Sequence, residues 1–153
     1  TFCNDRSVTG ESGYLTTPTT YYGAFNRLYN KRTPSLKCVQ DNDKFKVSNA
    51  SAKLDYPISL ITADEVAMAG GVYNTANSNY YLYNGQYFWT LSPSYFESYR
   101  SIARVWFVNP SGSLHHWNYV ATSFGTRPVI NLKADTQITK GDGTALNPFV
   151  MQS

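Results

Sequence analysis

Charged side chains are scarce in this chain: 15% of its 153 residues are Asp, Glu, Lys or Arg, and the formal net charge is +3. No long basic run occurs, and the densest spot is Asn30-Lys31-Arg32. Proteins that bind nucleic acid through its phosphates concentrate Lys and Arg on one surface. The composition therefore argues against a nucleic-acid partner.

Long apolar segments are also missing, so the sequence predicts no transmembrane helix, which needs about 20 consecutive apolar residues. No segment has the pattern of a signal or transit peptide. The chain begins at Thr1 without Met. We interpret it as a mature or trimmed part of a longer protein.

Motifs for catalysis and metal binding are absent as well. The sequence contains no G-x-S-x-G, H-E-x-x-H or phosphate-loop motif. The two cysteines and the adjacent His115 and His116 match no zinc spacing. Asp142, which stands between two glycines, is typical of a hairpin turn rather than of a calcium site. We therefore expect no enzyme, no metal and no cofactor.

Cysteine occurs only twice, as Cys3 and Cys38. An even pair in a Tyr-, Asn-, Ser- and Thr-rich chain of low charge fits an exported protein, which predicts a disulfide. Such a bridge closes a loop of about 35 residues and contributes about 4 kcal/mol on the chain-entropy model. Two unrelated buried thiols are the alternative.

Aromatic residues, in contrast, are abundant: they make up 16% of the chain, and 13 of them are Tyr. Within residues 88–132 they stand among Arg and His. Rigid rings beside Arg give contact area at little cost in rotamer entropy, which is typical of surfaces that bind a partner. For any one residue alone, packing in a loop or sheet is the alternative. The candidate ligand-binding residues are Tyr95, Glu97, Tyr99, Arg100, Arg104, Trp106, His115, His116, Trp117, Tyr119, Ser123 and Phe124.

Short strands, one firm helix and long irregular stretches predict a single α+β domain over residues 1–153. The helix begins with a capping box, Thr62 to Glu65, and ends at Gly70-Gly71. Residues 21–29 are either a short helix or irregular. Further short strands are expected at residues 45–47, 56–61 and 127–132.

Two hairpins are expected in the middle of the chain. The first joins residues 80–83 to 86–90 through Asn84-Gly85. In the second, the strand 103–108 turns at 109–112. Its alternation predicts that Arg104 and Trp106 face outward, so that Ala in place of Trp106, Trp117 and Tyr119 leaves folding intact.

Several segments stand in the order known from one family. They are Phe2–Ser7 (FCNDRS), Leu60–Glu65 (LITADE), Trp89–Ser94 (WTLSPS), Gly125–Leu132 (GTRPVINL), and Gly141–Thr144 (GDGT) followed by Asn147–Val150 (NPFV). Together they resemble an extracellular bacterial domain of unknown function from Gram-positive surface and pilin-like proteins. That family is similar to the C-type-lectin fold, in the branch that includes formylglycine-generating enzymes and the variable proteins of diversity-generating retroelements.

The resemblance implies a C-type-lectin-like fold of short antiparallel strands, one or two short helices and much loop, with further residues upstream of FCNDRS. It also implies that residues 94–126 correspond to the diversified region of the variable proteins. Two features depart from the wider group. The cysteines lie outside the position of the catalytic pair of formylglycine-generating enzymes, and no Glu-Pro-Asn or Gln-Pro-Asp tripeptide for calcium-dependent sugar binding occurs.

The sequence thus predicts an exported or bacterial cell-surface domain that binds a protein or glycan ligand on another cell or host surface. The alternative is a pilin-like structural subunit whose aromatic patch packs on neighbouring subunits. An enzyme of the formylglycine-generating type is the third hypothesis.

Overall fold

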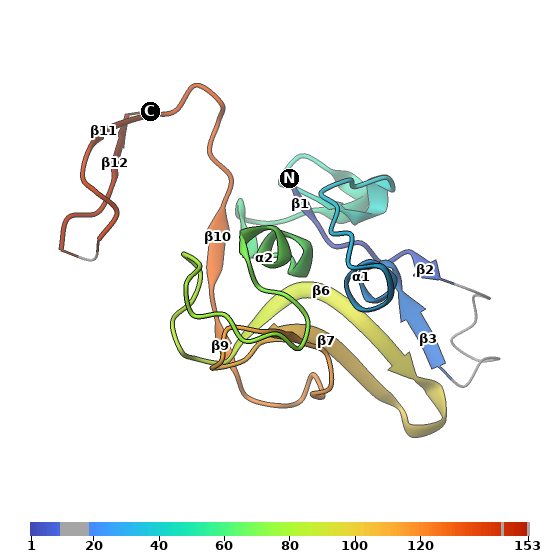
Figure 1. The fold of residues 1–153 in the computed structure, drawn as a ribbon. Helices are drawn as coiled ribbons and strands as arrows, with labels where there is room; N and C mark the ends of the chain where they lie inside the picture. Colours follow the sequence, from blue (N-terminus) through green and yellow to red (C-terminus); the bar gives the residue numbers. More distant parts are fainter. Residues whose placement is uncertain (10–18, 145, 153) are drawn as a thin grey trace.

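The computed structural model describes residues 1–9, 19–144 and 146–152, and it has an α+β architecture with many short strands and few short helices (Figure 1). The predicted α+β class is confirmed at this level. The elements follow in this order: β1 (Phe2–Cys3), β2 (Val8–Thr9), β3 (Thr19–Tyr22), α1 (Gly23–Phe25), the π-helical segment η1 (Asn26–Lys31), the short turn η2 (Asp41–Asp43), β4 (Lys44–Phe45), the turn η3 (Ala50–Ala52), β5 (Ile58–Leu60), α2 (Ala63–Ala69), β6 (Phe88–Glu97), the turn η4 (Ser98–Arg100), β7 (Ile102–Val108), β8 (Leu114–His115), β9 (Gly125–Thr126), β10 (Pro128–Ile130), β11 (Gln137–Lys140) and β12 (Val150–Gln152).

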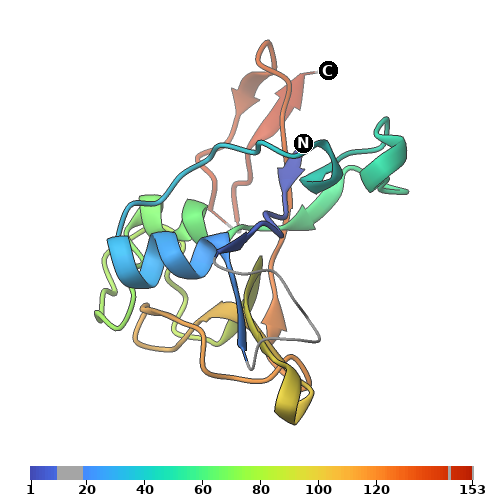
Figure 2. The same ribbon diagram turned by 90° about the vertical axis from the view of Figure 1, so that its right-hand side faces the viewer.

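The main sheet has the strand order β2-β3-β6-β7-β8, and β9 pairs in parallel with the start of β6. All other pairs in this sheet are antiparallel. Helices α1 and α2 lie on the same side of the β6–β7 ribbon (Figures 1 and 2). The main core forms there, with Phe88, Trp106 and Leu114 from the sheet packed with Ala24 and Val66 from the helices.

Strand β6 pairs irregularly with β7, because extra residues of β6 are inserted on both sides of Pro93. Proline has no backbone N–H to donate to the ladder, and the amide of Leu91 donates instead to the carbonyl of Ile61, at 2.8 Å. A bulge of this kind changes the face to which later side chains point. Phe88 and Tyr95 therefore lie on the same face of the sheet, although they are an odd number of positions apart in the sequence.

Helix α2 begins as predicted. The hydroxyl of Thr62 accepts a hydrogen bond from the amide of Glu65, and the Glu65 carboxylate accepts one from the amide of Thr62. The amide of Ala63 donates to the hydroxyl of Ser92, which ties the helix to the bulged part of β6. The helix ends at Gly70, whose φ of 123° lies in a region that favours glycine.

The second predicted hairpin is confirmed, whereas the first is wrong. β7 and β8 pair across the turn at Asn109–Gly112. Residues 80–87 form no strand; Tyr80 is buried there and donates its hydroxyl to the carbonyl of Gly112 at 2.8 Å. A bond to distant backbone, rather than a cross-strand ladder, holds this segment, so its Asn84-Gly85 turn does not join two strands.

The predicted orientation of β7 is also wrong. Trp106 is completely buried and Arg104 is 8% exposed, so both face the interior together with Val108. The alternation of residues 103–108 gave the wrong orientation because both faces of β7 are covered by other parts of the protein. Phe107, on the opposite face, is buried as well and packs against Trp89 and Phe124.

The predicted Cys3–Cys38 disulfide is present, with a Cα–Cα distance of 5.6 Å. A neighbouring ion network ties the same region to α2: Arg27 donates to Asp64 at 2.8 Å and also to Asp5. These carboxylates raise the pKa of the Arg27 guanidinium, against the opposing effect of its burial. The disulfide therefore joins β1 to the segment that follows η1, and Arg27 connects Asp5 to the first turn of α2.

The other predicted segments are observed with shorter or different bounds. Strand β4 covers Lys44–Phe45, where a strand at 45–47 was predicted. Strands β5 and β10 lie within the predicted strands 56–61 and 127–132. Residues 21–29 contain the end of β3, then α1 and most of η1. The β11–β12 hairpin stands apart from the rest of the chain (Figures 1 and 2), and all of its described side chains are exposed.

Candidate ligand-binding site

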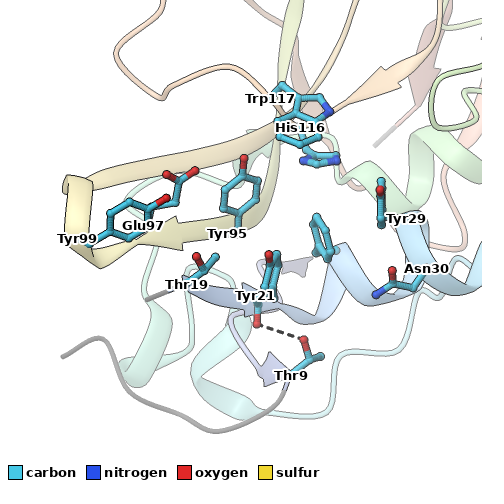
Figure 3. Close-up of a pocket in the computed structure, with 11 residues that line it drawn as sticks. Thr9, Thr19, Tyr21, Tyr29, Asn30, Tyr95, Glu97, Tyr99, His116 and Trp117 are labelled. Carbon is cyan, nitrogen blue, oxygen red and sulfur yellow. Dashed lines mark hydrogen bonds between the residues drawn. The ribbon is translucent and has the colours of Figure 1, made fainter. Parts of the chain in front are cut away.

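A hollow of about 530 Å³ opens between β3, η1, the end of β6 and the residues that follow β8 (Figure 3). We call this cavity the hollow. Its size lies within the range of small-molecule sites, about 300–1,000 Å³. The lining residues are Thr9, Thr19, Tyr21, Phe25, Tyr29, Asn30, Tyr95, Glu97, Tyr99, His116 and Trp117.

Local structure explains why rings gather here. Tyr21 on β3 stands opposite Tyr95 on β6, and their ring centroids are 5.7 Å apart. Phe25 and Tyr29 lie one helical turn apart and stack at 4.9 Å, as neighbours at this spacing do. The bulge at Pro93 turns Tyr95 toward this side of the sheet. The hollow therefore depends on the N-terminal segment as much as on the β6–β7 hairpin.

His116 lies at the inner end of the hollow and is 1% exposed. Six aromatic rings surround its imidazole at centroid distances of 4.8–5.7 Å. Burial, together with the nearby His115 and Arg104, lowers the pKa of His116 to about 4. At neutral pH the ring is therefore uncharged, with one N–H donor and one acceptor nitrogen.

Arg104 and Glu97 form a buried ion pair beside His116, with Nη2 of Arg104 3.3 Å from Oε1 of Glu97. The Arg104 guanidinium also lies over three rings, those of Tyr95, Trp117 and Tyr119, at 5.1, 5.9 and 4.6 Å. Each such cation–π contact contributes roughly 0.5–2 kcal/mol. The amide of Val120 donates to the carbonyl of Ala103, which keeps the 117–120 segment against β7.

Several polar atoms at the hollow are buried and have no hydrogen-bond partner. They include both ring nitrogens of His116, the hydroxyl of Tyr95 and Oε2 of Glu97. Burial also raises the pKa of the Tyr95 hydroxyl to about 12, so it keeps its proton at neutral pH. An unpaired buried polar group costs roughly 1–3 kcal/mol. Buried polar groups normally have a partner, so this group of atoms without one makes the hollow the candidate site.

The structure brings only part of the predicted site together. Tyr95, Glu97, Tyr99, His116 and Trp117 line the hollow. Three more candidates lie beside them: Arg100 within 3.7 Å of Glu97, and Arg104 and Tyr119 in the cation–π contact.

Four predicted residues lie elsewhere. Trp106 belongs to the core, which corrects its assignment to the binding surface. His115 and Phe124 contact Phe107 on the opposite face of β7, and Ser123 is exposed outside the lining of the hollow. His115 and His116 both contact the Tyr73 ring, but only His116 lines the hollow.

Sequence reasoning missed the N-terminal half of the site. The six residues concerned are Thr9, Thr19, Tyr21, Phe25, Tyr29 and Asn30. The one available signal was the aromatic density of residues 21–29, which were expected to be either a short helix or irregular. Nothing local indicated that this segment faces Tyr95, because the pairing of β3 with β6 joins residues more than 70 positions apart.

Within the described ranges 1–9, 19–144 and 146–152, no group of three or more His, Cys, Asp or Glu side chains is arranged to hold a metal ion. In the same part of the chain, no helix has both the length and the apolar character needed to cross a membrane. The chain matches no protein-family model, no curated protein and no solved structure in the three comparisons made.

Replacing two tryptophans separately distinguishes core from site. Trp106→Ala is expected to lower the free energy of unfolding by about 3–5 kcal/mol, because it empties a fully buried position. Trp117→Ala is expected to cost less than about 1 kcal/mol, because Trp117 is 54% exposed. Urea denaturation of both variants measures the difference. Equal losses of unfolding free energy would contradict the assignment of Trp106 to the core and Trp117 to the site.

The stability of the protein is expected to fall as pH drops from 6.5 toward 4. The unfolded chain binds a proton at His116 near pH 6.5, whereas the folded protein does so only near pH 4. Between these values the unfolded state holds more protons, so acid favours it, by up to about 3 kcal/mol. Burial lowers the pKa of His115 too, so it adds in the same direction.

The measurement is denaturation at a series of pH values for the wild type and for His116→Phe, which keeps a ring but cannot titrate. The variant should lose less stability across this window, with the remaining slope coming from His115. Parallel pH profiles for the two proteins would show that His116 is not the group responsible.

Proposed function

We propose that this chain is a ligand-binding domain and that the hollow is its binding site. The observation that carries the proposal is the combination of aromatic walls with buried polar atoms that lack partners, His116 and Tyr95 above all. Binding sites for small groups have this composition: apolar and aromatic walls with a few placed polar groups that fix orientation. The ligand belongs to a protein or glycan of another cell or host surface.

The exposed rings at the rim support the same proposal. Tyr99 is 63% exposed, Trp117 is 54% exposed, and Arg100 lies over the ring of Tyr99 at 5.2 Å. Large rings next to Arg are enriched among the residues that dominate binding energy. A partner that enters the hollow therefore meets further contact area around its opening.

An extracellular location belongs to the same proposal. The Cys3–Cys38 disulfide is consistent with an oxidising compartment, because cytosolic thiols are kept reduced. The C-type-lectin-like fold and the relation to the surface-protein family are proposed with it, on the sequence segments that resemble that family. An experimental structure of the protein, compared with known C-type-lectin-like folds, would test both.

Diversification by a retroelement is proposed for a narrower set of positions than the whole range 94–126. Trp106 and Leu114 are completely buried, so substitution there would damage the core. Sequences of this locus from many isolates should vary at exposed positions of the range and agree at these two. The exposed candidates in the range are Tyr99, Arg100, Trp117, Tyr119 and Ser123.

Two variants test the binding function directly. Ligands are first selected with the wild-type protein from a glycan array and a displayed peptide library. Trp117→Ala is expected to weaken the binding of a selected ligand by tenfold or more, since truncation of a ring that dominates binding costs more than about 1.4 kcal/mol. Tyr81→Ala is the matched control, because Tyr81 is 81% exposed and lies outside the hollow. If Trp117→Ala binds the selected ligand as tightly as the wild type does, the binding site lies elsewhere.

A structural subunit is the alternative, and a separate observation favours it. The β11–β12 hairpin exposes Ile138, Val150 and Met151, and Phe149 is half exposed beside them. Isolated two-stranded hairpins are marginally stable in water, so burial against a second copy of the chain would stabilise this one.

Sedimentation velocity tests the alternative. Self-association should appear with rising protein concentration and should be reduced in the double variant Ile138→Ser and Val150→Ser. A wild-type protein that stays monomeric throughout the concentration series contradicts a self-assembling subunit and leaves the ligand-binding proposal unaffected.

A further inference from the structure

The buried polar atoms of the hollow that have no hydrogen-bond partner define what a ligand must offer. Oε2 of Glu97 can only accept a hydrogen bond, while neutral His116 and the Tyr95 hydroxyl each offer one donor and at least one acceptor. A complementary ligand therefore supplies several donors and some acceptors within a short distance. Glu97 and Tyr95 are two positions apart on β6, which places their side chains on one face about 7 Å apart.

Positively charged donors do not suit this position. Nη1 of Arg100 lies 3.7 Å from Oε2 of Glu97, and Arg104 already pairs with the other carboxylate oxygen. Two guanidinium groups against one carboxylate leave a local excess of positive charge, which repels an ammonium ligand. The donors that remain are uncharged, and hydroxyl groups provide donor and acceptor in the same atom.

The walls of the hollow select for an apolar face on the same ligand. Tyr21, Phe25 and Tyr29 form a continuous aromatic wall with centroid spacings of 4.5 and 4.9 Å, and Trp117 closes the side near His116 (Figure 3). A pyranose ring combines these features, because its C–H groups form an apolar face and its hydroxyls project around the edge. Dispersion contacts with the rings favour such a face.

An extended peptide fits less well. Strand β3 pairs with β2 and β6, and the part of β6 that lines the hollow pairs with β3 and β7. Their backbone hydrogen-bonding groups are therefore engaged on both sides, and a peptide cannot add to them as a further strand.

We infer that the hollow binds the ring of a hexopyranose without calcium, with the sugar hydroxyls bonded to His116, Tyr95 and Glu97 and the sugar face against the aromatic wall. This inference rests on the proposed binding function and names its ligand class. The atoms without partners are closed off from solvent, and the inference requires that the half-exposed Trp117 ring, which packs 4.8 Å from the His116 ring, turns aside to admit the sugar. Trp117 is held there by one polar contact, its Nε1–H to the Tyr73 hydroxyl at 3.2 Å.

The test uses the whole chain and the methyl glycosides of glucose, galactose, mannose and N-acetylglucosamine, in buffer containing EDTA. Binding is followed by tryptophan fluorescence, which reports movement of Trp117, and by calorimetry. At least one glycoside is expected to bind saturably and to change the fluorescence. The change should disappear in Trp117→Phe.

Two hydroxyl deletions make the test specific. Tyr95→Phe removes a hydroxyl that has no partner in the protein, so it should leave the denaturation midpoint unchanged or raised while weakening sugar binding by roughly five- to tenfold. Tyr80→Phe is the matched control: its hydroxyl bonds to Gly112 outside the hollow, so the midpoint should fall while affinity stays the same.

The inference is overturned if no glycoside of the panel binds saturably, or if Tyr95→Phe binds as tightly as the wild type. These outcomes differ from failure of the binding function itself. A selected protein ligand that depends on Trp117, in the absence of any sugar binding, would retain the site and reject the saccharide. If every variant of the hollow still binds the sugar and the selected ligand as the wild type does, both the saccharide inference and the proposed binding site are rejected.

Discussion

The irregular pairing of β6 with β7 is the constraint on which the rest of the structure depends. Pro93 cannot donate to the ladder, and the Leu91 amide bonds to Ile61 next to the start of α2. The inserted residues reverse the facing of the later side chains. Phe88 therefore joins the main core at one end of β6, while Tyr95 and Glu97 point to the same side at the other end, where the hollow forms.

One consequence is that the same face of the main sheet covers an apolar core at one end and buried polar side chains at the other. Trp106 stands at the boundary: its ring packs in the core and also lies 5.0 Å from the His116 ring. Beyond it, Arg104 and Glu97 are buried as a pair, and the cost of desolvating both charges opposes their mutual attraction and the contacts with the surrounding rings. Buried polar groups that destabilise a protein are typical of functional sites. For this reason we place the proposed binding site at His116, Tyr95 and Glu97.

Much of the local structure could be predicted from the sequence, because it is decided by neighbours along the chain. The capping box of α2 and the β7–β8 turn are of this kind. Errors arose where distant contacts decide. The Asn84-Gly85 turn lacks its hairpin because Tyr80 bonds to Gly112, and Trp106 faces inward because covering elements bury both faces of β7. Half of the site was predictable as an aromatic cluster, and the other half came from Thr9 and from residues 19–30.

By itself the sequence determined the α+β class, the disulfide pair and the presence of an aromatic and Arg-rich segment, since composition and short-range spacing carry this information. Only the tertiary structure decided which rings are core and which line a cavity. That choice depends on the register of β6 and on the pairing of β3 with β6. A shift of one residue moves a side chain to the other face of a sheet, and no local pattern records it.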